Sequence, residues 1–477
     1  MFIILTFVFI FYIFYSFIYK NVVYRQKVAI GPMPLPIIGN LNLIKSPHID
    51  LTKLGEKYGK VFPLWFGDRY SMIINDPVVF RDTIVKNSMS FISRPKNISF
   101  SLVSYGHINI LNSEYNQWNR NRGLLKQYFT NNALIKTLSP TVNTQVSTLL
   151  DILKRKEKLN EPFKPRFYLD RINMNIILGF VIGKDLGFDL GDPNIMKLNK
   201  SLQDTIRLVS LGSPGDYINI LTPFYSTYFK LFGSAIDEAD NFMSSVYDER
   251  RAKYHPDNET HDIMDVLIHA LPDPKERKCI VFMCLDLFIA GADANSNLGE
   301  WLFAYLSENP MIQEKAYREL VSVFGENGFA TSEKKQSTPY FNAVLKEVMR
   351  LKPSLALSIP REVTEDITIN DVFYPKGTIV IPNIYSINRS AEYWENPLQF
   401  DPDRFLDNEF NQAFIPFSLG ERSCLGLNFA NQTFYTIYAN IILNFKFHPA
   451  EKVTYEDEAS LVIHPKNDNS FILKSRL

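Results

Sequence analysis

The sequence has few cysteines and no excess of charge of either sign. Three cysteines occur among 477 residues, at positions 279, 284 and 424, which excludes a disulfide framework and is typical of a reducing compartment. Lys plus Arg and Asp plus Glu number 51 each, and no long run of one sign predicts a surface that binds nucleic acid. These absences favour small-molecule chemistry and a protein body that faces the cytosol.

The chain also lacks a second linker. No long low-complexity segment and no internal repeat divides residues 41–477, so we expect one large domain there despite the usual limit on domain size. With 46% hydrophobic and 14% aromatic residues, the chain has enough apolar side chains to bury a large core.

The N-terminal segment MFIILTFVFIFYIFYSFIY, residues 1–19, contains no charged side chain. As a helix it would extend about 28 Å, which is enough to span a bilayer. Lys20, Arg25 and Lys27 follow it, so the positive-inside rule places the rest of the chain in the cytosol. We interpret residues 1–19 as a transmembrane anchor and residues 20–40, which are basic and proline-rich, as a stiff connector. A cleaved signal peptide is the alternative.

The hydrophobic patterns predict a mainly helical domain with short strands. Strand-like runs occupy residues 61–66 and 71–75 and return within residues 361–381, whereas residues 114–350 have mostly helical periodicity. The longest predicted helix runs over residues 274–308, about 50 Å at helical rise. We therefore expect a mainly α fold with smaller β-sheets (α+β), in which the long helix crosses the core.

The segment FSLGERSCLG, Phe417 to Gly426, places the third cysteine between glycines. Gly420 and Gly426 let the backbone turn tightly and approach a flat ligand. Cys424 precedes a predicted helix, whose N-terminal N–H groups favour the thiolate that iron binds. These residues alone also allow a small buried hydrophobic residue or a nucleophile, although no histidine lies nearer in sequence than His448.

The pattern Phe417, Gly420, Arg422, Cys424 and Gly426 resembles the haem-binding loop of the cytochrome P450 family at each defining position. The resemblance implies that Cys424 is the axial thiolate ligand of a b-type haem, that Phe417 packs beside the sulfur, and that Arg422 pairs with a haem propionate. Gly426 then lets the loop lie against the haem. The anchor and the proline-rich connector extend the resemblance to microsomal members of the family.

Two further segments resemble family motifs that brace the haem. KEVMR places Glu347 and Arg350 three residues apart on one helix face, where they can pair; alone, such a pair is usually a solvated helix face. FDPDRF, residues 400–405, looks like the family segment whose arginine, here Arg404, completes a buried Glu-Arg-Arg network. The resemblance implies a structural network without a catalytic role.

Three more side chains are expected to bind the haem propionates. WNRNR places Trp118 and Arg122 at i and i+4, so an indole N–H and a guanidinium share one helix face and suit carboxylates. The family uses this pair on the propionates, and Arg361, in IPREVTED, lies where the family often has a propionate-binding histidine or arginine. Surface charge is the alternative for each.

The long helix carries FIAGADANSN, residues 288–297, which is similar to the family's oxygen-binding motif Ala-Gly-x-Asp/Glu-Thr. The small residues at 290 and 291 are expected to let the helix bow, with Asp293 beside the bend to relay protons. Ala294, which has no hydroxyl, stands where the family has threonine. Asn295, Ser296, ordered water or a substrate hydroxyl could take over its role, and the sequence does not choose among them.

The resemblance implies a haem-thiolate monooxygenase that inserts one oxygen atom into an apolar organic substrate. Electrons would come from NADPH through a separate cytochrome P450 reductase, because the chain has no Gly-x-Gly-x-x-Gly fingerprint. Cys279 and Cys284 are too few for an iron–sulfur site and are interpreted as core residues. The resemblance also predicts a single-pass protein of the endoplasmic reticulum membrane with a cytosolic catalytic domain.

Two alternatives to the monooxygenase remain at this stage. One is a reductase-independent isomerase or dehydratase of hydroperoxides, and the other is a haem protein that binds ligands without turnover. Candidate substrate contacts, taken from the resemblance, are residues 98–110, Phe288 and Ala292, residues 355–359 and residues 461–463. Apolar residues at such positions are more often ordinary core, so the sequence predicts an apolar pocket and leaves the substrate unidentified.

Overall fold

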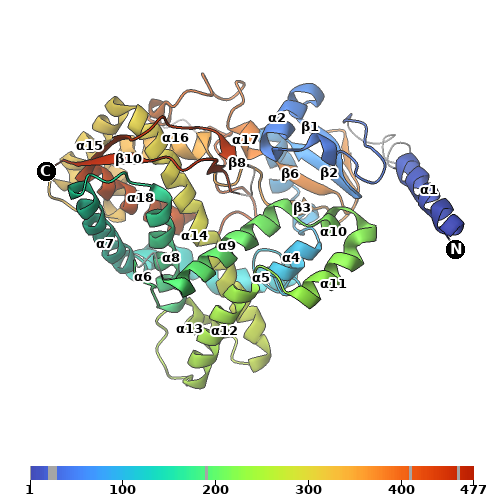
Figure 1. The fold of residues 1–477 in the computed structure, drawn as a ribbon, viewed down its shortest axis with the longest axis horizontal. Helices are drawn as coiled ribbons and strands as arrows, with labels where there is room; N and C mark the ends of the chain where they lie inside the picture. The colour runs from blue at the N-terminus through green and yellow to red at the C-terminus, as the bar shows by residue number, and fades with distance from the viewer. Residues whose placement is uncertain (1, 20–29, 189–191, 408–410, 459–461, 477) are drawn as a thin grey trace.

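The protein is mainly helical with small β-sheets (Figure 1), which confirms the predicted fold class. The computed structural model describes residues 2–19, 30–188, 192–407, 411–458 and 462–476. Part of the predicted connector, with Lys20, Arg25 and Lys27, lies outside these residues, as does Leu461 of the last candidate substrate segment.

Helix α1, Phe2–Ile18, projects from the folded body (Figure 1). Its 17 uncharged residues are at the short end of the roughly 17–25 residues that span a bilayer. Among the described residues, the stretch that is long and apolar enough to cross a membrane is instead Pro274–Glu308, and most of its apolar part is buried. That stretch is a core helix, so the membrane role of α1 stays a prediction.

The largest sheet has the strand order β1-β2-β6-β3 and joins distant parts of the chain. β1 (Val61–Phe66) and β2 (Arg69–Ile74) form an antiparallel hairpin, which Gly67 turns with φ of +59°. β2 pairs in parallel with β6 (Ile379–Pro382), and β3 (Arg361–Glu362) pairs antiparallel with β6. This register fixes the backbone of Arg361, a predicted site residue.

Three two-stranded sheets complete the β-structure of the described residues. Each is antiparallel, and two of them place the C-terminal segment against earlier parts of the chain. The pairs are β4 (Ile367–Ile369) with β5 (Val372–Tyr374), β7 (Phe445–Pro449) with β10 (Phe471–Ser475), and β8 (Asp457–Glu458) with β9 (His464–Pro465).

Helix α14, Arg277–Glu308, crosses the centre of the molecule as predicted (Figure 1). Its 32 residues extend about 48 Å at helical rise. A short 3-10 turn, Pro274–Glu276, precedes it and is capped by Asp273. The α-helix continues through residues 290 and 291 without a 3-10 or π interruption. Gly291 instead permits close packing, because a Cβ at that position would lie 2.8 Å from Ile177 of α8, Pro165–Ile182.

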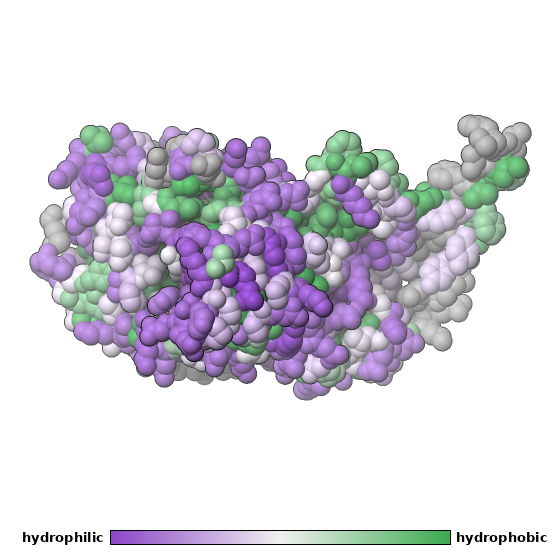
Figure 2. Space-filling view, turned by 90° about the horizontal axis from the view of Figure 1, so that it is seen from below, coloured by the Kyte–Doolittle hydropathy of each residue, from purple (hydrophilic) through white to green (hydrophobic). Residues whose placement is uncertain are grey.

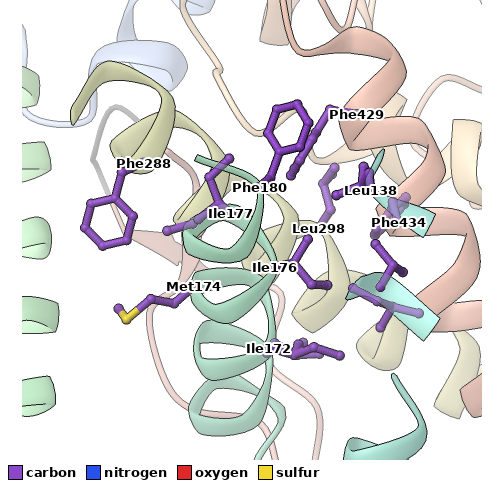
Figure 3. Packing of buried hydrophobic residues seen from close by; sticks show 14 of the residues in the cluster. Leu138, Ile172, Met174, Ile176, Ile177, Phe180, Phe288, Leu298, Phe429 and Phe434 are labelled. Carbon is purple, nitrogen blue, oxygen red and sulfur yellow. The ribbon is translucent and has the colours of Figure 1, made fainter. Parts of the chain in front are cut away.

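Apolar side chains from α8, α14 and α18 (Leu427–Asn444) form the core around this crossing. Figure 3 shows Ile176 of α8 on the side of Leu298 of α14 and Phe434 of α18, and Ile177 on the side of Phe288 of α14. Burial of these side chains stabilises the crossing by roughly 1.5–3 kcal/mol each. The core therefore fixes α14, which carries the predicted oxygen-binding motif, against α18, which follows the cysteine loop.

The other helices surround this core (Figure 1). Most begin with proline or a capping side chain, as the sequence rules for helix starts predict. They are α2 (Pro47–Tyr58), α3 (Pro77–Phe80), α4 (Ile98–Val103), α5 (Tyr115–Lys126), α6 (Asn131–Thr137), α7 (Ser139–Lys158), α9 (Pro193–Leu211), α10 (Pro214–Tyr217), α11 (Thr222–Phe232), α12 (Asp237–Ala252), α13 (Ile263–Ala270), α15 (Pro310–Phe324), α16 (Pro339–Leu351) and α17 (Ile384–Ile387).

Candidate functional site

The cysteine loop is a tight turn that ends at α18. The N–H of Cys424 donates to the carbonyl of Phe417 at 3.0 Å, and the N–H of Ser423 donates to the carbonyl of Gly420 at 3.0 Å. Gly420 has φ of +76°, a left-handed conformation that glycine adopts without strain. Gly426 is the N-cap residue of α18. The loop therefore presents Cys424 at the N-terminus of a long buried helix, as the sequence predicts.

The thiol of Cys424 lies on the wall of an interior space. The residue is exposed to solvent, yet burial is the main influence on its thiol and raises the pKa, against smaller effects of the Gly426 N–H and Arg122. The two observations agree if the sulfur faces a hollow within the protein. The predicted effect of the helix N-terminus on the thiol is thus outweighed by burial, and a thiolate here requires a cationic partner such as a metal ion.

Ala290, in the predicted oxygen-binding motif of α14, is accessible. It is exposed, although Phe288 has 0% and Ala292 has 3% of its surface accessible. The predicted substrate contacts Phe288 and Ala292 are therefore buried, and Figure 3 shows Phe288 among core side chains. The accessible position on this part of α14 is Ala290, which has a small side chain.

Three of the predicted propionate-binding residues meet beside the cysteine loop. The ring of Trp118, in α5, lies between two guanidinium groups, 4.6 Å from Arg422 and 5.7 Å from Arg122. Arg422 is buried and donates to the carbonyls of Ile92, Ile110, Leu111 and Ser113. Trp118 thus holds both guanidiniums by cation–π contact.

Arg361 and Arg94 add two more buried cations to this group. Arg361 is 2% exposed and Arg94 is 5% exposed. Arg94 donates to the carbonyls of Ile359 and Pro360, both at 2.8 Å. Burial, with repulsion among the arginines, lowers the pKa of Arg361 and that of Arg422 each to about 9. Within the described part of the chain, none of these arginines or Arg122 forms an ion pair with a carboxylate.

Buried cations without anionic partners require an anionic ligand. Arg94, Arg122, Arg361 and Arg422 lie close enough to repel one another, and Arg122 also acts on the thiol of Cys424. A flat ligand with two carboxylates and a central metal would satisfy both the arginines and the thiol. The residues present therefore fit a haem, with its propionates at the arginines and its iron at the sulfur.

The predicted Glu-Arg-Arg network is assembled. Arg350 and Glu347, both 0% exposed, form two hydrogen bonds of 2.7 Å, and Arg404 donates to Glu347 at 3.2 Å. Arg350 also donates to the carbonyls of Asn388 and Pro397. Because the network ties α16 to the irregular stretch before the cysteine loop, it braces that stretch and has no contact that suggests catalysis.

On the opposite side, Asp293 belongs to an ion network that sequence reasoning missed. Arg166, in α8, contacts Asp293 at 2.6 Å, Asp170 at 2.8 Å and Glu300 at 3.1 Å. His464, in β9, lies 3.2 Å from Asp293 through Nε2 and 2.6 Å from Arg166 through Nδ1. A guanidinium only donates, so Nδ1 accepts and the Nε2–H is directed toward Asp293.

Burial and neighbouring charges shift the pKa values of the acids in this network in opposite directions. Burial alone would raise the pKa of Asp293, but His464 and Arg166 hold that pKa well below its ordinary value. Burial raises the pKa of Glu300 to about 7, and it also raises the pKa of Asp170. Three carboxyl groups thus share the single guanidinium of Arg166, and a proton on Glu300 or Asp170 relieves the repulsion among these groups.

Asn295 and Ser296 are engaged with neighbouring helices. Asn295 donates to Thr433 of α18 at 2.7 Å. Ser296 donates to the carbonyl of Ala292 at 3.0 Å and accepts from Asn173 of α8 at 3.1 Å. Both side chains are buried. These contacts account for both polar groups by packing, and the proposal that either replaces the missing threonine gains no support from them.

A hydroxyl from another element contacts the backbone of Ala294. Ser354, which follows α16, donates to the carbonyl of Ala294 at 3.1 Å. The segment after it pairs with the C-terminal turn, since Leu355 bridges Val462 and Ile463 donates to the carbonyl of Ser354. The predicted substrate segments 355–359 and 461–463 therefore meet beside Ala294, for the residues that the structure describes.

The missed residues carry no local signal. Ser354, Arg166 and His464 stand in the sequence as single polar residues without a motif, and Arg94 likewise. Their partners lie 60 residues away for Ser354 and 298 residues away for the pair of Arg166 and His464. Only the fold reveals these contacts. Cys279 and Cys284 are both buried, in agreement with the predicted core role.

Comparison with known proteins decides the family. The sequence model described as Cytochrome P450 matches residues 30–471. The chain belongs to the cytochrome P450 family. Among its relatives in Dictyostelium discoideum, "Probable cytochrome P450 508A4" is 33% identical over 470 residues, 94% of this chain and 93% of the relative. "Probable cytochrome P450 508A2" is 33% identical over 434 residues, 87% of each chain.

Membership of the cytochrome P450 family confirms the class of cofactor and reaction. The family uses haem b with an axial cysteine thiolate, and its members are generally oxidoreductases of the monooxygenase class. A third relative, "Probable cytochrome P450 519C1", is 31% identical over 480 residues. The residues of this cytochrome P450 suit that cofactor: the thiol of Cys424 suits its metal, and the arginines without carboxylate partners suit its carboxylates.

Proposed function

We propose that this cytochrome P450 is a membrane-associated haem-thiolate monooxygenase that oxygenates an apolar organic substrate. One observation carries the proposal: the accessible thiol of Cys424 occurs together with buried arginines, Arg361 and Arg422, that form no ion pair with a carboxylate. A bound haem would supply activation of dioxygen, with one oxygen atom inserted into the substrate and the other released as water.

Each residue of the cysteine side would have one task. Cys424 would hold the iron and donate electron density to it, and Phe417 would cover the loop beside the sulfur. Arg361, Arg422, Arg122 and Trp118 would bind the propionates. Arg94, which the sequence did not single out, would hold the backbone of residues 359 and 360 in place behind Arg361.

On the oxygen side we propose that Asp293 receives protons through His464. The imidazole is partly accessible, with 19% of its side chain exposed, whereas Asp293 is 6% exposed. His464 thus links the buried carboxylate to the outside. Ser354, at the carbonyl of Ala294, offers the hydroxyl that Ala294 lacks. Arg166 would hold Asp293 in position between proton transfers.

We propose association with the endoplasmic reticulum membrane through α1 and through α11. α11 presents large apolar side chains to solvent, as a membrane-facing helix does. In Figure 1, α10 and α11 lie at the end of the body from which α1 projects, and Figure 2 shows an apolar patch at that end. The exposed side chains near and in α11 include Ile220, Phe224, Tyr228, Leu231 and Phe232. NADPH-derived electrons would come from a separate reductase.

The test of the haem site is the spectrum of the reduced, CO-bound protein. Thiolate ligation shifts the Soret band far to the red, and Cys424→Ala should abolish that shifted band while the protein stays folded by circular dichroism. Cys284→Ala, which changes a fully buried cysteine of α14, is the matched control and should keep the band. A Cys424→Ala protein that retained the band would sink the proposed ligand.

A second candidate function is a reductase-independent isomerase or dehydratase of hydroperoxides. One observation favours it: the acid Asp293 is engaged by Arg166 and His464, and threonine is absent at Ala294. To separate the two, candidate lipids are incubated with NADPH and reductase, and their hydroperoxides are incubated without reductase. Product in the second reaction alone would overturn the monooxygenase, and product in the first alone would exclude the isomerase.

A further inference from the structure

Asp286 is a buried carboxyl group with no part in the site described so far. It lies on α14 one turn before Ala290, so both side chains are on the same helix face. Its carboxylate accepts from the side-chain amide of Asn109 at 2.6 Å and from the backbone N–H groups of Ile110 and Leu111 at 2.7 and 2.8 Å. All three donors belong to one loop, which covers residues 104–114 between α4 and α5.

The same loop is held from its other side by the arginines of the cysteine side. Arg422 donates to the carbonyls of Ile110, Leu111 and Ser113, and Arg94 donates to Leu111 at 3.2 Å. The N–H groups of the loop thus bind α14, and its carbonyls bind Arg94 and Arg422. Residues 109–113 therefore join α14 to the arginines of the cysteine side.

Earlier in the loop, Tyr105 and Ile108 make separate contacts with α14. Asn109 is 0% exposed, and its carbonyl accepts from Asn121 of α5 at 3.2 Å and from the Ser113 hydroxyl. These contacts fix the shape of the loop and its distance from α5. Residues 109–111 contact α14 through Asp286, whose charge-assisted hydrogen bonds are roughly twice as strong as neutral ones.

We propose that Asp286 is a positioning residue that holds residues 109–113 against α14 and so sets the size of the ligand that the cavity admits. The proposal rests on the proposed function in one respect, since it takes the space between Ala290 and Cys424 to be the substrate cavity. A merely structural role would stabilise the fold without changing the ranking of ligands by size.

The variants test the role of the Asp286 carboxylate separately from effects on folding. Asp286→Asn keeps the side-chain shape and removes the charge, and Asn109→Ala removes one partner from the loop side. Asp76→Asn is the matched control, because Asp76 is also buried and also accepts two backbone N–H groups, from Val78 and Val79, at a remote helix start. All variants are made in the full haem-loaded chain. They are measured at about pH 8 so that the carboxyl group of Asp286 is ionised, because burial raises its pKa to about 7.

The first measurement is hydrogen–deuterium exchange of peptides that cover residues 104–114. Asp286→Asn should speed exchange of the Ile110 and Leu111 amides at least about tenfold, and Asn109→Ala should have a smaller effect of the same sign. Asp76→Asn should leave these amides unchanged. Unchanged exchange in Asp286→Asn would overturn the proposal. This measurement needs no turnover, so it stands even if the CO-bound spectrum refutes thiolate ligation.

The second measurement is binding of imidazole and of phenyl-substituted imidazole to the ferric protein, followed by the Soret shift. Loosening the loop should favour the bulky ligand, so the ratio of the two Kd values should change at least about fivefold in Asp286→Asn, by about 1 kcal/mol. Asp76→Asn should keep the wild-type ratio. Faster exchange with an unchanged ratio would make Asp286 a structural residue only, and the proposal would fail.

Discussion

Ala294 is the residue at which this cytochrome P450 departs from its family's oxygen-binding motif. Its carbonyl accepts from Ser354, so a hydroxyl is present at this point of α14 although the side chain of residue 294 is a methyl group. Asn295 and Ser296, the other candidates, bond to α18 and α8. The chemical question at this residue is therefore whether Ser354 performs the task of the missing threonine.

Ser354→Ala and Ala294→Thr test this question in opposite directions. If Ser354 supplies the hydroxyl, Ser354→Ala should raise the peroxide released per NADPH oxidised several-fold, because protons then reach the bound oxygen poorly. Ala294→Thr should lower that release and should rescue Ser354→Ala. Peroxide is measured with purified reductase, and Ser337→Ala, at an exposed 3-10 turn, is the control. An unchanged release in Ser354→Ala would assign the task to another group.

Glu300 predicts a pH dependence of stability. Its pKa is raised to about 7 from an ordinary 4.5, chiefly by burial, so folding takes up a proton between these values. The contribution of this proton to the free energy of unfolding is fully present below this interval and is lost as the pH rises through about 7. Glu300→Gln lacks this titration. From about pH 5 to about pH 8, the unfolding free energy of the wild type should therefore fall by about 1–3 kcal/mol relative to the variant.

Chemical denaturation at a series of pH values measures this difference. Glu308→Gln, at the exposed end of the same helix, is the control and should run parallel to the wild type. A wild-type-minus-Glu300→Gln difference that stays constant with pH would show that Glu300 remains ionised in the folded protein, and the shared proton of the Arg166 network would then have to lie elsewhere.

At the scale of elements, α14 depends on glycine for its contacts with two other helices. Gly291 allows the approach of α8, and at Gly299 a Cβ would lie 1.8 Å from the Tyr438 hydroxyl and 2.7 Å from Leu169. The helix carries Asp286, Ala290, Asp293 and Ala294 on adjoining turns. Any shift of α14 therefore moves the loop contact, Ala290 and the proton-relaying acid together.

Gly299→Ala should show how closely these helices are packed. The added methyl group forces α14, α8 and α18 apart, and overpacking of this kind costs about 1–3 kcal/mol. Gly123→Ala, in α5, adds the same methyl group where nothing lies within 4 Å, so it should be neutral or stabilise the protein by up to about 1 kcal/mol. Urea denaturation of both variants gives the comparison, and equal stabilities would contradict it.

The elements themselves could largely be predicted from the sequence. The periodicity at residues 274–308 and the strand at residues 61–66 are local patterns, and both elements formed with boundaries within three residues of those predicted. The family motif around Cys424 was likewise local. The contacts of Arg166 with Asp293 and His464 span 127 and 298 residues, and Asp286 binds a loop 175 residues earlier. No local pattern encodes such partners, so sequence reasoning missed them.

For the whole molecule, the membrane proposal predicts two separable attachments. A chain that begins at residue 30 lacks α1, yet it should still float with vesicles of neutral phospholipid, because α11 keeps its exposed apolar side chains. Adding Leu231→Glu and Phe232→Glu, at residues that are 72% and 73% exposed, should release it into the soluble fraction. Leu159→Glu, at a residue that is 67% exposed elsewhere on the body, is the matched control and should leave flotation unchanged.

Two outcomes of the flotation assay would contradict this prediction. If removal of α1 alone abolishes flotation, α11 has no part in attachment. If the chain that begins at residue 30 floats with and without the glutamates, some other surface binds the lipid. Neither result bears on the haem site, because Cys424 and its arginines are outside α1 and α11.

The last strand of the chain completes the core beside α14. Phe471 is 0% exposed and exchanges backbone hydrogen bonds of 2.7 and 2.9 Å with Phe163, and β10 pairs with β7. Near the other end, His48 contacts Asp457, 409 residues later. A chain that stops before Phe471 lacks the contacts with Phe163 and with β7. A premature stop codon at position 471 or earlier should therefore yield a protein that is degraded without haem.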